Sequence, residues 1–598
     1  MIAAVSGASD DAAVKAIATK LGNAGGGGVP PEVGAAGASH VAVMAWPGVS
    51  SRIDCKRGLA WTGRITGQGL VGALPTEVGD LGGTFSVAAT TGDRLVLARS
   101  LFGGRSMYFA RDAGHRALVA CSRLGPLAGS LSTAPALDVT RLAALVLGVP
   151  ALDERSTIFD GIRRVVPGET LSFGYEGDIF RSRAALIPLD AAPRDWASEL
   201  RGEFERAVSR ATSGCKRVAI LLSGGLDSSA VFAALVARER GASAREVADI
   251  MAITLDFDAS HSDRPYLDSL AKAYGIVPVR VAPNECASHA FSSLVIDGAP
   301  RAWPSAAMEV HLLEVARAGG ADVVLSGVGG DFFFDLEFIS FGERALAGDV
   351  FGAAWDAASL RAVYWKPTKR GRIGDFVIRP LIRGVLPPRL LRGLRRMRGR
   401  ASRRGPEWAG PALRRFAAEV HDAAIASEPA RGRGARMNEL AQSSVFADIA
   451  DALTQIEVYS GCREEHLYFD ADFARFLASI PSDVVLQDGW LRGVVRAAFR
   501  DGWPECIRAR EDKGDFEPAF AAFLAGLRAS GELDRLLRME ALGDLGLVEP
   551  RRFRESFEQL TSDPDNGGAW TRHWPALAVE EFASRRDLAT IKRIGMVA

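Results

Sequence analysis

The residues most able to do chemistry lie together in the segment SGGLDSS, residues 223–229. A short, β-branched apolar run at residues 218–222 precedes it and predicts a strand buried on both faces. Residues 226–238 carry apolar side chains at helical spacing, so the segment is predicted to be a glycine turn that opens a helix. The first N–H groups of a helix have no partner and lie at the positive end of its dipole, so this turn is a predicted anion site.

The side chains of the turn also suit a bound phosphate. The two glycines let backbone amides approach a ligand without a Cβ in the way, the serines add hydroxyl donors, and Asp227 offers a carboxylate to a metal ion. The turn is not a Walker loop, because the chain contains no Gly-Lys pair. The predicted phosphate-binding residues of this segment are Leu222, Ser223, Gly224, Gly225, Asp227, Ser228 and Ser229.

SGGLDSS resembles the pyrophosphate loop, SGGxDSS, of the ATP-pyrophosphatase superfamily. Those enzymes split ATP into AMP and pyrophosphate while they adenylate a carboxylate or carbonyl oxygen. The resemblance implies ATP and Mg²⁺ here, and implies that the next predicted strand, residues 250–256 with Ile253, ends beside the adenine. The alternative is an ordinary strand–turn–helix built from small residues, and the combination of two glycines with a preceding Ser and a following Asp-Ser-Ser disfavours it.

A second strand and glycine turn, ADVVLSGVGGD at residues 321–331, resembles the VLSGxGxDE segment of asparagine synthetases and β-lactam synthetases. The resemblance implies that Asp331 and Asp227 together hold Mg²⁺, an ion that takes one or two carboxylates plus phosphate oxygens. Val328 stands where asparagine synthetases have Glu and β-lactam synthetases have Tyr, and it cannot transfer a proton, so it argues against both activities. The nucleotide-binding residues predicted from this second segment are Ser326 and Gly327.

A third stretch, residues 460–516, is similar to the later motifs of the asparagine synthetases. Its parts EEHLYFDADFARFLASIPSDV and GWLRGVVRAAFRDGWPECIRAREDKGDF resemble the family's RxPFLDxxLVEFxLSLP and KxLLRxAxxxxLPxxIxxRxKxGF. The resemblance implies that Lys513 reaches the ATP phosphates, where its charge favours the departure of pyrophosphate. Glu464 and Glu465 lie in a region that supplies an acid in β-lactam synthetases. The predicted catalytic residues are Lys513, Asp227, Asp331 and Glu465.

The N-terminal part of the chain carries a resemblance of its own. LVLARSLFGGRSMYFAR, followed by ALVACSRLGPLAG, is similar to the amidotransferase domain of asparagine synthetases, which implies an N-terminal-nucleophile sandwich of two sheets between helices. Working members carry a cysteine at position two, and its thiolate attacks glutamine. This chain has Ile2 there, and the nearest cysteine in the sequence is Cys55, so glutamine hydrolysis is not expected. The domain is then predicted to be a degenerate one that serves as a scaffold or docking surface.

Length and composition bound the remaining possibilities. A chain of 598 residues is too long for one core, and we predict an amidotransferase-like domain over 1–190 and an ATP-pyrophosphatase domain over 191–598. Strands predicted at 218–222, 250–256 and 278–281 alternate with helices, as in a doubly wound parallel sheet, so the fold class is α/β.

The same composition excludes several classes of partner. The net charge of zero gives no support for nucleic-acid binding. We expect neither a membrane span nor a signal peptide, because the sequence has no apolar run of membrane-spanning length and no basic segment followed by an apolar core near residue 1. Six dispersed cysteines without a Cys-x-x-Cys pair indicate reduced thiols, and we expect a cytoplasmic protein. The basic tract 366–404 is expected to be a solvated helical insertion, or else a surface for an acidic or peptide partner.

Among the relatives, the lasso-peptide cyclase fits these departures best. Such an enzyme adenylates an Asp or Glu side chain of a precursor peptide, and the peptide's own α-amine then closes a macrolactam, so no ammonia is needed. The expected partners are the precursor peptide, a leader peptidase and a leader-binding protein. The alternatives are an asparagine synthetase or β-lactam synthetase, and a catalytically silent paralogue that only binds ATP or a protein. The joint presence of Ser223, Asp227, Asp331 and Lys513 argues against the silent paralogue.

Overall fold

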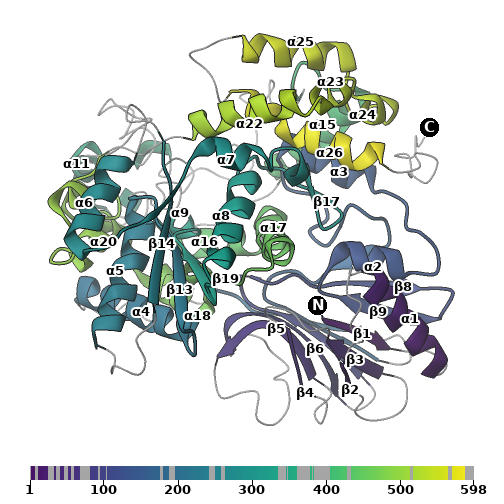
Figure 1. The fold of residues 1–598 in the computed structure, drawn as a ribbon, viewed down its shortest axis with the longest axis horizontal. Helices are drawn as coiled ribbons and strands as arrows, with labels where there is room; N and C mark the ends of the chain where they lie inside the picture. Colours follow the sequence, from purple (N-terminus) through teal and green to yellow (C-terminus); the bar gives the residue numbers. More distant parts are fainter. Residues whose placement is uncertain are drawn as a thin grey trace.

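A computed structural model gives the fold of the chain (Figure 1). It describes residues 2–6, 11–24, 32–34, 41–45, 51–54, 59–66, 81–91, 94–102, 104–174, 179–186, 195–241, 249–257, 263–334, 345–346, 348–359, 377–379, 382, 405–426, 433–511, 516–562 and 569–585. Lys513, Cys55 and almost all of the basic tract 366–404 lie outside these ranges. None of the helices within them has both the length and the apolar character needed to cross a membrane.

The N-terminal part consists of two six-stranded antiparallel sheets. The first has the order β10-β8-β9-β1-β3-β2 and the second the order β12-β11-β7-β6-β5-β4. Their strands are β1 (Ile2–Ser6), β2 (Glu32–Gly34), β3 (Val41–Ala45), β4 (Ser51–Asp54), β5 (Leu59–Thr66), β6 (Gly82–Thr91), β7 (Arg94–Arg99), β8 (Tyr108–Asp112), β9 (Ala117–Cys121), β10 (Ile162–Arg164), β11 (Glu169–Phe173) and β12 (Ile179–Arg183).

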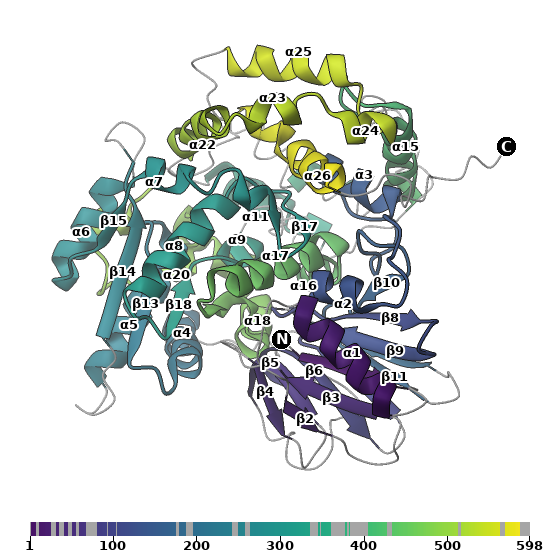
Figure 2. The same cartoon turned by 45° about the vertical axis from the view of Figure 1, so that its right-hand side comes forward.

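Alternation along β1 shows how these sheets are layered. Ala4 is buried in one cluster with Leu97 of the second sheet, whereas Ala3 and Val5 share a cluster with Ile17 of α1 (Asp11–Ala24). Successive side chains of a strand point to opposite faces, so β1 contacts the second sheet on one side and a helix on the other. Figure 2 shows α1 lying across the first sheet. The helix-covered double sheet predicted from the sequence is therefore confirmed.

A five-stranded parallel sheet forms the centre of the C-terminal part, in the order β15-β14-β13-β18-β19. Its strands are β13 (Arg217–Leu221), β14 (Asp249–Leu255), β15 (Val279–Val281), β18 (Val323–Ser326) and β19 (Glu464–His466). Val218 and Ile220 are buried in a cluster that includes residues of α4 (Trp196–Thr212) and α5 (Leu226–Gly241), while Ala219 lies in the cluster of α8 (Ala306–Ala318). Helices thus cover both faces, as predicted for a doubly wound sheet.

One strand of this sheet was not predicted. β19 pairs in parallel with β18, with Leu325 opposite Glu465, although its three residues are Glu, Glu and His. A strand this short and polar has neither the alternation nor the apolar run that marks a strand in sequence. Its position is set by the tertiary structure, because α17 (Ser444–Ser460) ends at Gly461 and returns the chain to the edge of the sheet.

Helices make up most of the remaining C-terminal part, and α22 to α26 lie above both sheet systems (Figure 1). The elements not yet bounded are α2 (Leu124–Ser130), α3 (Val139–Leu147), α6 (Arg264–Tyr274), α7 (Pro283–Ala287), β16 (Val295–Ile296), β17 (Ala299–Pro300), α9 (Gly330–Phe334), α11 (Val350–Ser359), α15 (Pro411–Ala426), α16 (Arg433–Ala441), α18 (Ala471–Ser479), α19 (Ser482–Val485), α20 (Gly493–Ala498), α21 (Glu505–Arg508), α22 (Glu517–Ala529), α23 (Glu532–Leu536), α24 (Glu540–Asp544), α25 (Pro550–Thr561) and α26 (Trp574–Ser584).

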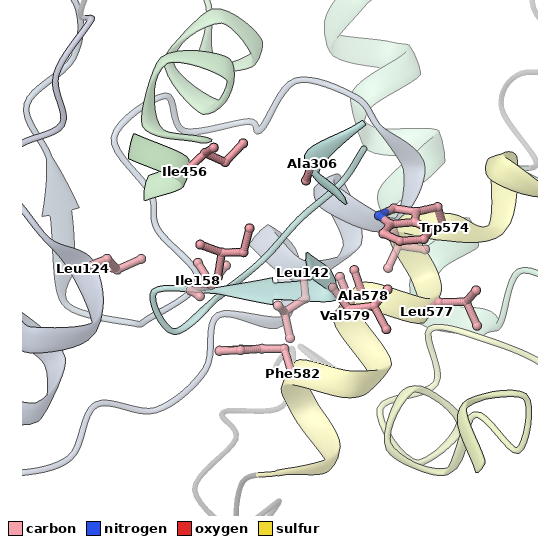
Figure 3. Close-up of a cluster of buried hydrophobic side chains, with 14 of the residues drawn as sticks. Leu124, Leu142, Ile158, Ala306, Ile456, Trp574, Leu577, Ala578, Val579 and Phe582 are labelled. Atoms are coloured by element: carbon pink, nitrogen blue, oxygen red, sulfur yellow. The ribbon is translucent and has the colours of Figure 1, made fainter. Parts of the chain in front are cut away.

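The last of these helices joins the two parts of the molecule. Figure 3 shows Trp574 and Phe582 of α26 in a buried cluster with Leu142 of α3 and Ile456 of α17. The Phe582 ring packs edge-on against that of Phe159, with 6.1 Å between centroids. Apolar burial contributes about 25 cal/mol per Å², so a cluster of this size contributes substantially to holding the N-terminal sandwich against the C-terminal helices.

Candidate nucleotide and metal site

The first glycine turn lies where β13 ends and α5 begins, as predicted. Its shape is fixed by its own hydroxyls. The Ser228 hydroxyl donates to Gly225 O at 3.2 Å and lies 3.1 Å from the Ser223 hydroxyl, and the Gly225 N–H donates to Ser223 Oγ at 3.2 Å. Gly224 has a φ of 74°, a left-handed conformation that favours glycine. The turn is thus held in one conformation by contacts within itself.

Four further residues of the predicted nucleotide site have distinct positions around this turn. The Leu222 N–H donates to Ile253 O at 2.8 Å, and both side chains are buried, so these two residues form the floor of the turn. Ser223 is exposed and available to a ligand. The Ser229 hydroxyl is buried, and within the described part of the chain it has no hydrogen-bond partner. Such a group normally finds a partner, so an acceptor oxygen arriving at this turn would suit it.

The second turn packs directly onto the first. A Cβ at Gly327 would lie 2.6 Å from Ser228 N, and one at Gly330 would overlap the carboxylate carbon of Asp227. A side chain at Gly327 would force the backbones of the two turns apart, and a side chain at Gly330 would displace the Asp227 carboxylate, so both positions favour glycine. This close approach brings Asp331, the residue after Gly330, next to Asp227, although the two aspartates lie on different helices.

A single arginine bridges the two aspartates. Arg492 binds Asp227 in two places, Nε to Oδ1 at 2.7 Å and Nη2 to Oδ2 at 2.8 Å, and Nη2 also donates to Asp331 Oδ1. Arg492 is buried against the turns, which lowers its pKa, but the two carboxylates more than offset this effect and raise the pKa overall. Two carboxylates that converge on one nitrogen form a donor set that fits one divalent ion such as Mg²⁺.

Arg492 was missed by the sequence analysis. It lies within the segment similar to the family's KxLLRxA motif and stands at the position of the motif's lysine, which is the signal that could have identified it. Its backbone is left-handed, with a φ of 57°, a conformation that is uncommon for a residue with a side chain and is often found at functional sites.

A second missed arginine contacts the first turn at Gly224. Arg510 donates from Nη1 to Gly224 O at 3.0 Å and pairs through Nη2 with Asp263, and its guanidinium lies 4.1 Å from the centre of the Tyr266 ring. It is almost completely buried. Lys513 follows it three residues later, outside the described residues, so its role as the lysine at the phosphates stays a prediction.

A protein-family comparison bears directly on these turns. The family model described as asparagine synthase matches residues 199–584, more than half of the chain, and this range includes both turns, both aspartates and Arg492. The chain belongs to the asparagine synthase family. It is accordingly an ATP-dependent, amide-forming ligase of asparagine synthase type, from a family that uses ATP and Mg²⁺. Its fold is α/β, with an amidotransferase-like sandwich before a parallel-sheet ATP-pyrophosphatase domain.

Two solved structures share a faint likeness with the chain. One is described as the allosteric regulatory enzyme of purine biosynthesis; it is 11% identical and covers 47% of this chain and 80% of its own, with a TM-score of 0.20. The other is glutamine phosphoribosylpyrophosphate amidotransferase from B. subtilis complexed with ADP and GMP, at 10% identity, 55% and 81% coverage and a TM-score of 0.20. Scores this low say nothing about the site. No curated protein matches the sequence.

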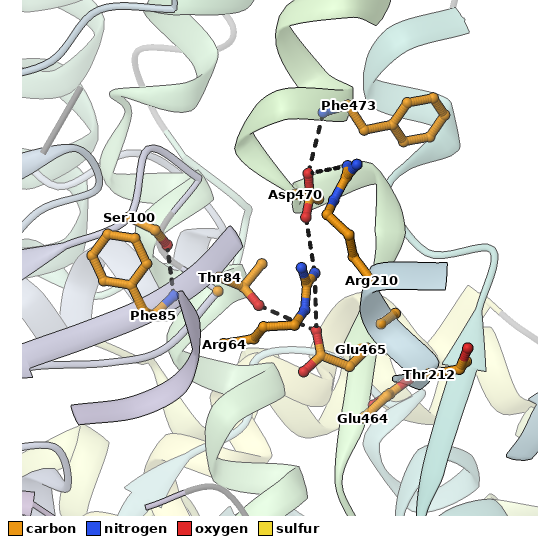
Figure 4. Close-up of polar contacts among 12 residues, drawn as sticks. Arg64, Thr84, Phe85, Ser100, Arg210, Thr212, Glu464, Glu465, Asp470 and Phe473 are labelled. Carbon is orange, nitrogen blue, oxygen red and sulfur yellow. Dashed lines mark hydrogen bonds and ion pairs between the residues drawn. The ribbon is translucent and has the colours of Figure 1, made fainter. Parts of the chain in front are cut away.

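Within this asparagine synthase homologue, the predicted catalytic acid Glu465 lies at the domain interface. Its carboxylate accepts from Arg463 at 3.1 Å and from the Thr84 hydroxyl at 3.3 Å, and it lies 3.7 Å from Arg64 of β5 (Figure 4). These cations outweigh the effect of burial and lower its pKa. Its contacts are those of a structural ion-pair network, so a catalytic role for Glu465 stays a prediction that its surroundings do not support.

The neighbouring acid, Glu464, points to the opposite face of the same strand. It hydrogen-bonds Ser326 of the second turn, and its carboxylate lies 3.6 Å from His466 Nε2. Burial, reinforced by the nearby Glu309, raises its pKa to about 8. His466, whose Nδ1 lies 3.1 Å from the Ser326 hydroxyl, is neutral because burial lowers its pKa to about 3. A proton acceptor with a pKa near neutrality in contact with the second glycine turn is a candidate general base.

At two positions, Val328 and Ile2, the sequence departs from that of working relatives. Val328 is exposed between the predicted nucleotide residue Gly327 and the positive-φ Gly329, with no proton to transfer. Ile2 begins β1, in register with Ala45 of β3, at the position where a working amidotransferase needs its nucleophile.

Proposed function

We propose that this protein is a macrolactam-forming ligase, a lasso-peptide cyclase that joins an Asp or Glu side chain of a precursor peptide to the peptide's own N-terminal amine. One observation carries the proposal. The ligase half brings Asp227 and Asp331 together on its two turns, with Arg492 between them, whereas the amidotransferase half has Ile2 in place of the nucleophile that would release ammonia. An amide ligase without its own ammonia source needs an amine that comes with the substrate.

The reaction uses ATP as a substrate. Attack of the peptide carboxylate on the α-phosphate forms an acyl adenylate and releases pyrophosphate, and attack of the α-amine then forms the amide and releases AMP and one proton. The turn at residues 223–229 would hold the phosphates, and Asp227 and Asp331 would hold Mg²⁺, which when bound balances phosphate charge. Arg492 supplies a fixed positive charge at the same place, where negative charge develops as pyrophosphate departs.

The α-amine must lose a proton to become an amide, and the residues near the second turn offer one acceptor. Glu464 lies against Ser326, and with a pKa of about 8 its carboxylate is partly ionised in neutral solution. Val328 cannot serve, since it carries no titratable group. Tethering of amine and carboxylate in one peptide raises their effective concentration and can supply several kcal/mol, roughly 7 or more in the best-aligned intramolecular cases.

The substrate and its companions follow from the same proposal. The precursor peptide would need its amine exposed by removal of a leader segment, which implies a leader peptidase and a protein that binds the leader. The degenerate sandwich, packed against the ligase half, would serve as a scaffold for the peptide. A cytoplasmic location is proposed as well, since free thiols such as Cys121 and Cys286 persist in a reducing compartment.

The test uses synthetic linear peptides that each carry a free N-terminal amine and one Asp or Glu, whose position is moved stepwise along the peptide. Each is incubated with the protein, ATP and Mg²⁺, and the products are analysed by mass spectrometry. We expect one peptide to lose one water, to resist aminopeptidase, and to form together with AMP rather than ADP.

The matched control is the same peptide with an acetylated N-terminus, which should form no ring. If the acetylated peptide lost water as readily, or if added ammonium were incorporated in its place, the cyclase proposal would be rejected in favour of a simple amidating ligase. ATP–pyrophosphate exchange in the presence of each peptide shows separately whether the carboxylate is activated at all.

A further inference from the structure

A cluster of two histidines and one glutamate lies outside the residues discussed so far. His311 and Glu314 are three positions apart on α8, so they share one face of the helix. His289 follows α7 and lies against that face. His289 Nε2 lies 3.3 Å from His311 Nδ1 and 3.2 Å from Glu314 Oε2, and the three ligand atoms all lie within 4.8 Å of one another.

We propose that His289, His311 and Glu314 form a binding site for a divalent transition metal, with Zn²⁺ the best fit. Zinc binds imidazole nitrogens and carboxylate oxygens at about 2.0–2.2 Å in a tetrahedral arrangement, which puts neighbouring ligand atoms about 3.3–3.5 Å apart. The two short separations in the cluster are close to this spacing, so an ion could enter with small side-chain movements. The proposal does not depend on the ligase reaction.

The chemistry of the donors selects the metal class. Imidazole suits Zn, Cu, Fe and Ni, whereas Mg²⁺ prefers oxygen donors and keeps several waters. Two imidazoles and one carboxylate therefore distinguish this cluster from the Asp227 and Asp331 pair, which offers oxygen alone. Glu314 is 42% exposed along its side chain and His289 19%, so the ion can enter from solvent, and a water can complete the coordination.

The position of the cluster gives the ion a structural consequence. It would join α8 to the end of α7, and α7 packs closely against α22, since a Cβ at Gly526 would lie 2.7 Å from Ala287 O. Helix α22 begins at Glu517, a few residues after Lys513. A metal bound at His289 would thus help to fix α7 and, through it, α22, the helix that follows Lys513 in the chain.

The alternative is a set of ordinary hydrogen bonds in which the His289 N–H is shared between His311 and Glu314. In that case the three residues would form a polar contact of ordinary strength, and removal of one member would have no effect on metal content. The two readings therefore differ in a direct measurement of metal binding.

The experiment uses the untagged full-length chain, stripped with a chelator and dialysed. Zn²⁺ is titrated against a chromophoric zinc indicator, with Mg²⁺ in excess so that the Asp227 and Asp331 pair does not contribute. We expect one tightly bound equivalent, its loss in His289→Ala and in His311→Ala, and its retention in His421→Ala, which removes a histidine on α15. X-ray absorption of the zinc-loaded chain should show imidazole and oxygen ligands without sulfur.

A near-isosteric variant protects the test from failures of folding. Glu314→Gln keeps the size of the side chain and should weaken Zn²⁺ binding about tenfold or more, since even outer-shell partners of a metal contribute that much. The absence of a saturable Zn²⁺ equivalent in the wild-type chain would overturn the proposal. It would also be overturned if Glu314→Gln bound Zn²⁺ with unchanged affinity and the folded histidine variants still bound one equivalent.

Discussion

The charges at the domain interface and the charges at the paired turns are arranged in opposite ways. Interface charges are buried and paired from one domain to the other, and the pairs are Arg64 with Asp470, Arg99 with Asp451, Arg105 with Glu457, and Arg141 and Arg164 with Asp448. At the turns, Asp331 is 56% exposed along its side chain and shares Arg492 with Asp227.

This difference shows what each half has retained. In every one of those interface pairs the guanidinium comes from the N-terminal sandwich and the carboxylate from the ligase half. A sandwich that has lost the chemistry at position two can keep this role, because the role depends on arginines that lie far from Ile2 in the sequence. The turns, in contrast, hold charge that is accessible to a ligand.

The substitution with the largest expected effect removes a charge at the turns and is measured by the loss of activity. Asp227→Asn should lower ATP–pyrophosphate exchange by about 10²–10³-fold or more, the range seen when one preorganised charge-stabilising group is removed. The fold should be retained, because Asn has the size of Asp and Arg492 keeps its contact with Asp331. Asp249→Asn is the matched control, since this exposed aspartate pairs with Arg217 at the other end of β13. Exchange near the wild-type rate in Asp227→Asn would remove this residue from the site.

The next effect concerns the interface. Asp470 is fully buried, pairs with Arg64 and Arg210, and caps α18 by accepting from the Phe473 N–H (Figure 4). Asp470→Asn should therefore lower the free energy of unfolding by about 3–5 kcal/mol, as expected when one partner of a buried ion pair is removed. Denaturant unfolding measures this change.

The matched control for that variant is Asp472→Asn, two residues along the same helix. Asp472 is about half exposed and pairs with Arg475, so its loss should change the unfolding free energy by at most about 1 kcal/mol. Equal effects of the two substitutions would mean that the interface network has no special importance for stability.

A third prediction uses pH to tell the two faces of β19 apart. The pKa of Glu465 is lowered by Arg64 and Arg105, so its contribution to stability is present above the unfolded pKa and is lost as the pH falls through the folded value. The pKa of Glu464 is raised from 4.5 to about 8, so between these values the native state binds a proton that the unfolded state has released, and stability falls as pH rises.

Measurement of the unfolding free energy against pH should show this contrast. Glu464→Gln should flatten the decline between about pH 5 and pH 8, whereas Glu465→Gln should flatten the loss of stability in acid. If both variants altered the same limb of the curve, the two carboxyls would not lie in different environments.

The last prediction is that one activity, glutamine hydrolysis, is absent. Purified protein incubated with glutamine should release no glutamate, because Ile2 cannot form a thioester. Glutamate release that co-purified with the chain and was lost on mutation of the ligase turns or of the sandwich would contradict the assignment of the sandwich as a scaffold.

The parts of the molecule that could be predicted are those whose pattern lies within one continuous stretch of the sequence. β13 with its turn and α5, and β18 with its turn, are strand, glycine turn and helix in direct succession, and local pattern is enough for these. Arg492 lies 265 residues from Asp227, and its contact with the turn depends on how α20 packs against α4 and α5. No local pattern contains that information.

The choice between Glu464 and Glu465 shows a different limit. Side chains alternate along a strand, so a displacement of one residue in an alignment exchanges the face toward the nucleotide turn with the face toward the sandwich. The similarity to β-lactam synthetases pointed to this pair of acids without predicting a strand, and only the pairing of β19 with β18 decides which acid faces which way.

The absence of a side chain at Gly330 affects how closely the two turns can approach each other. Two turns that lie far apart in the sequence meet here, and a Cβ at residue 330 would lie 2.4 Å from the carboxylate carbon of Asp227. A single added carbon would therefore displace the Asp227 carboxylate, one of the two proposed Mg²⁺ ligands, from its place beside Asp331. The position of that carboxylate thus depends on the absence of a carbon atom at residue 330, and Gly330 contributes to the proposed metal site without a side chain of its own.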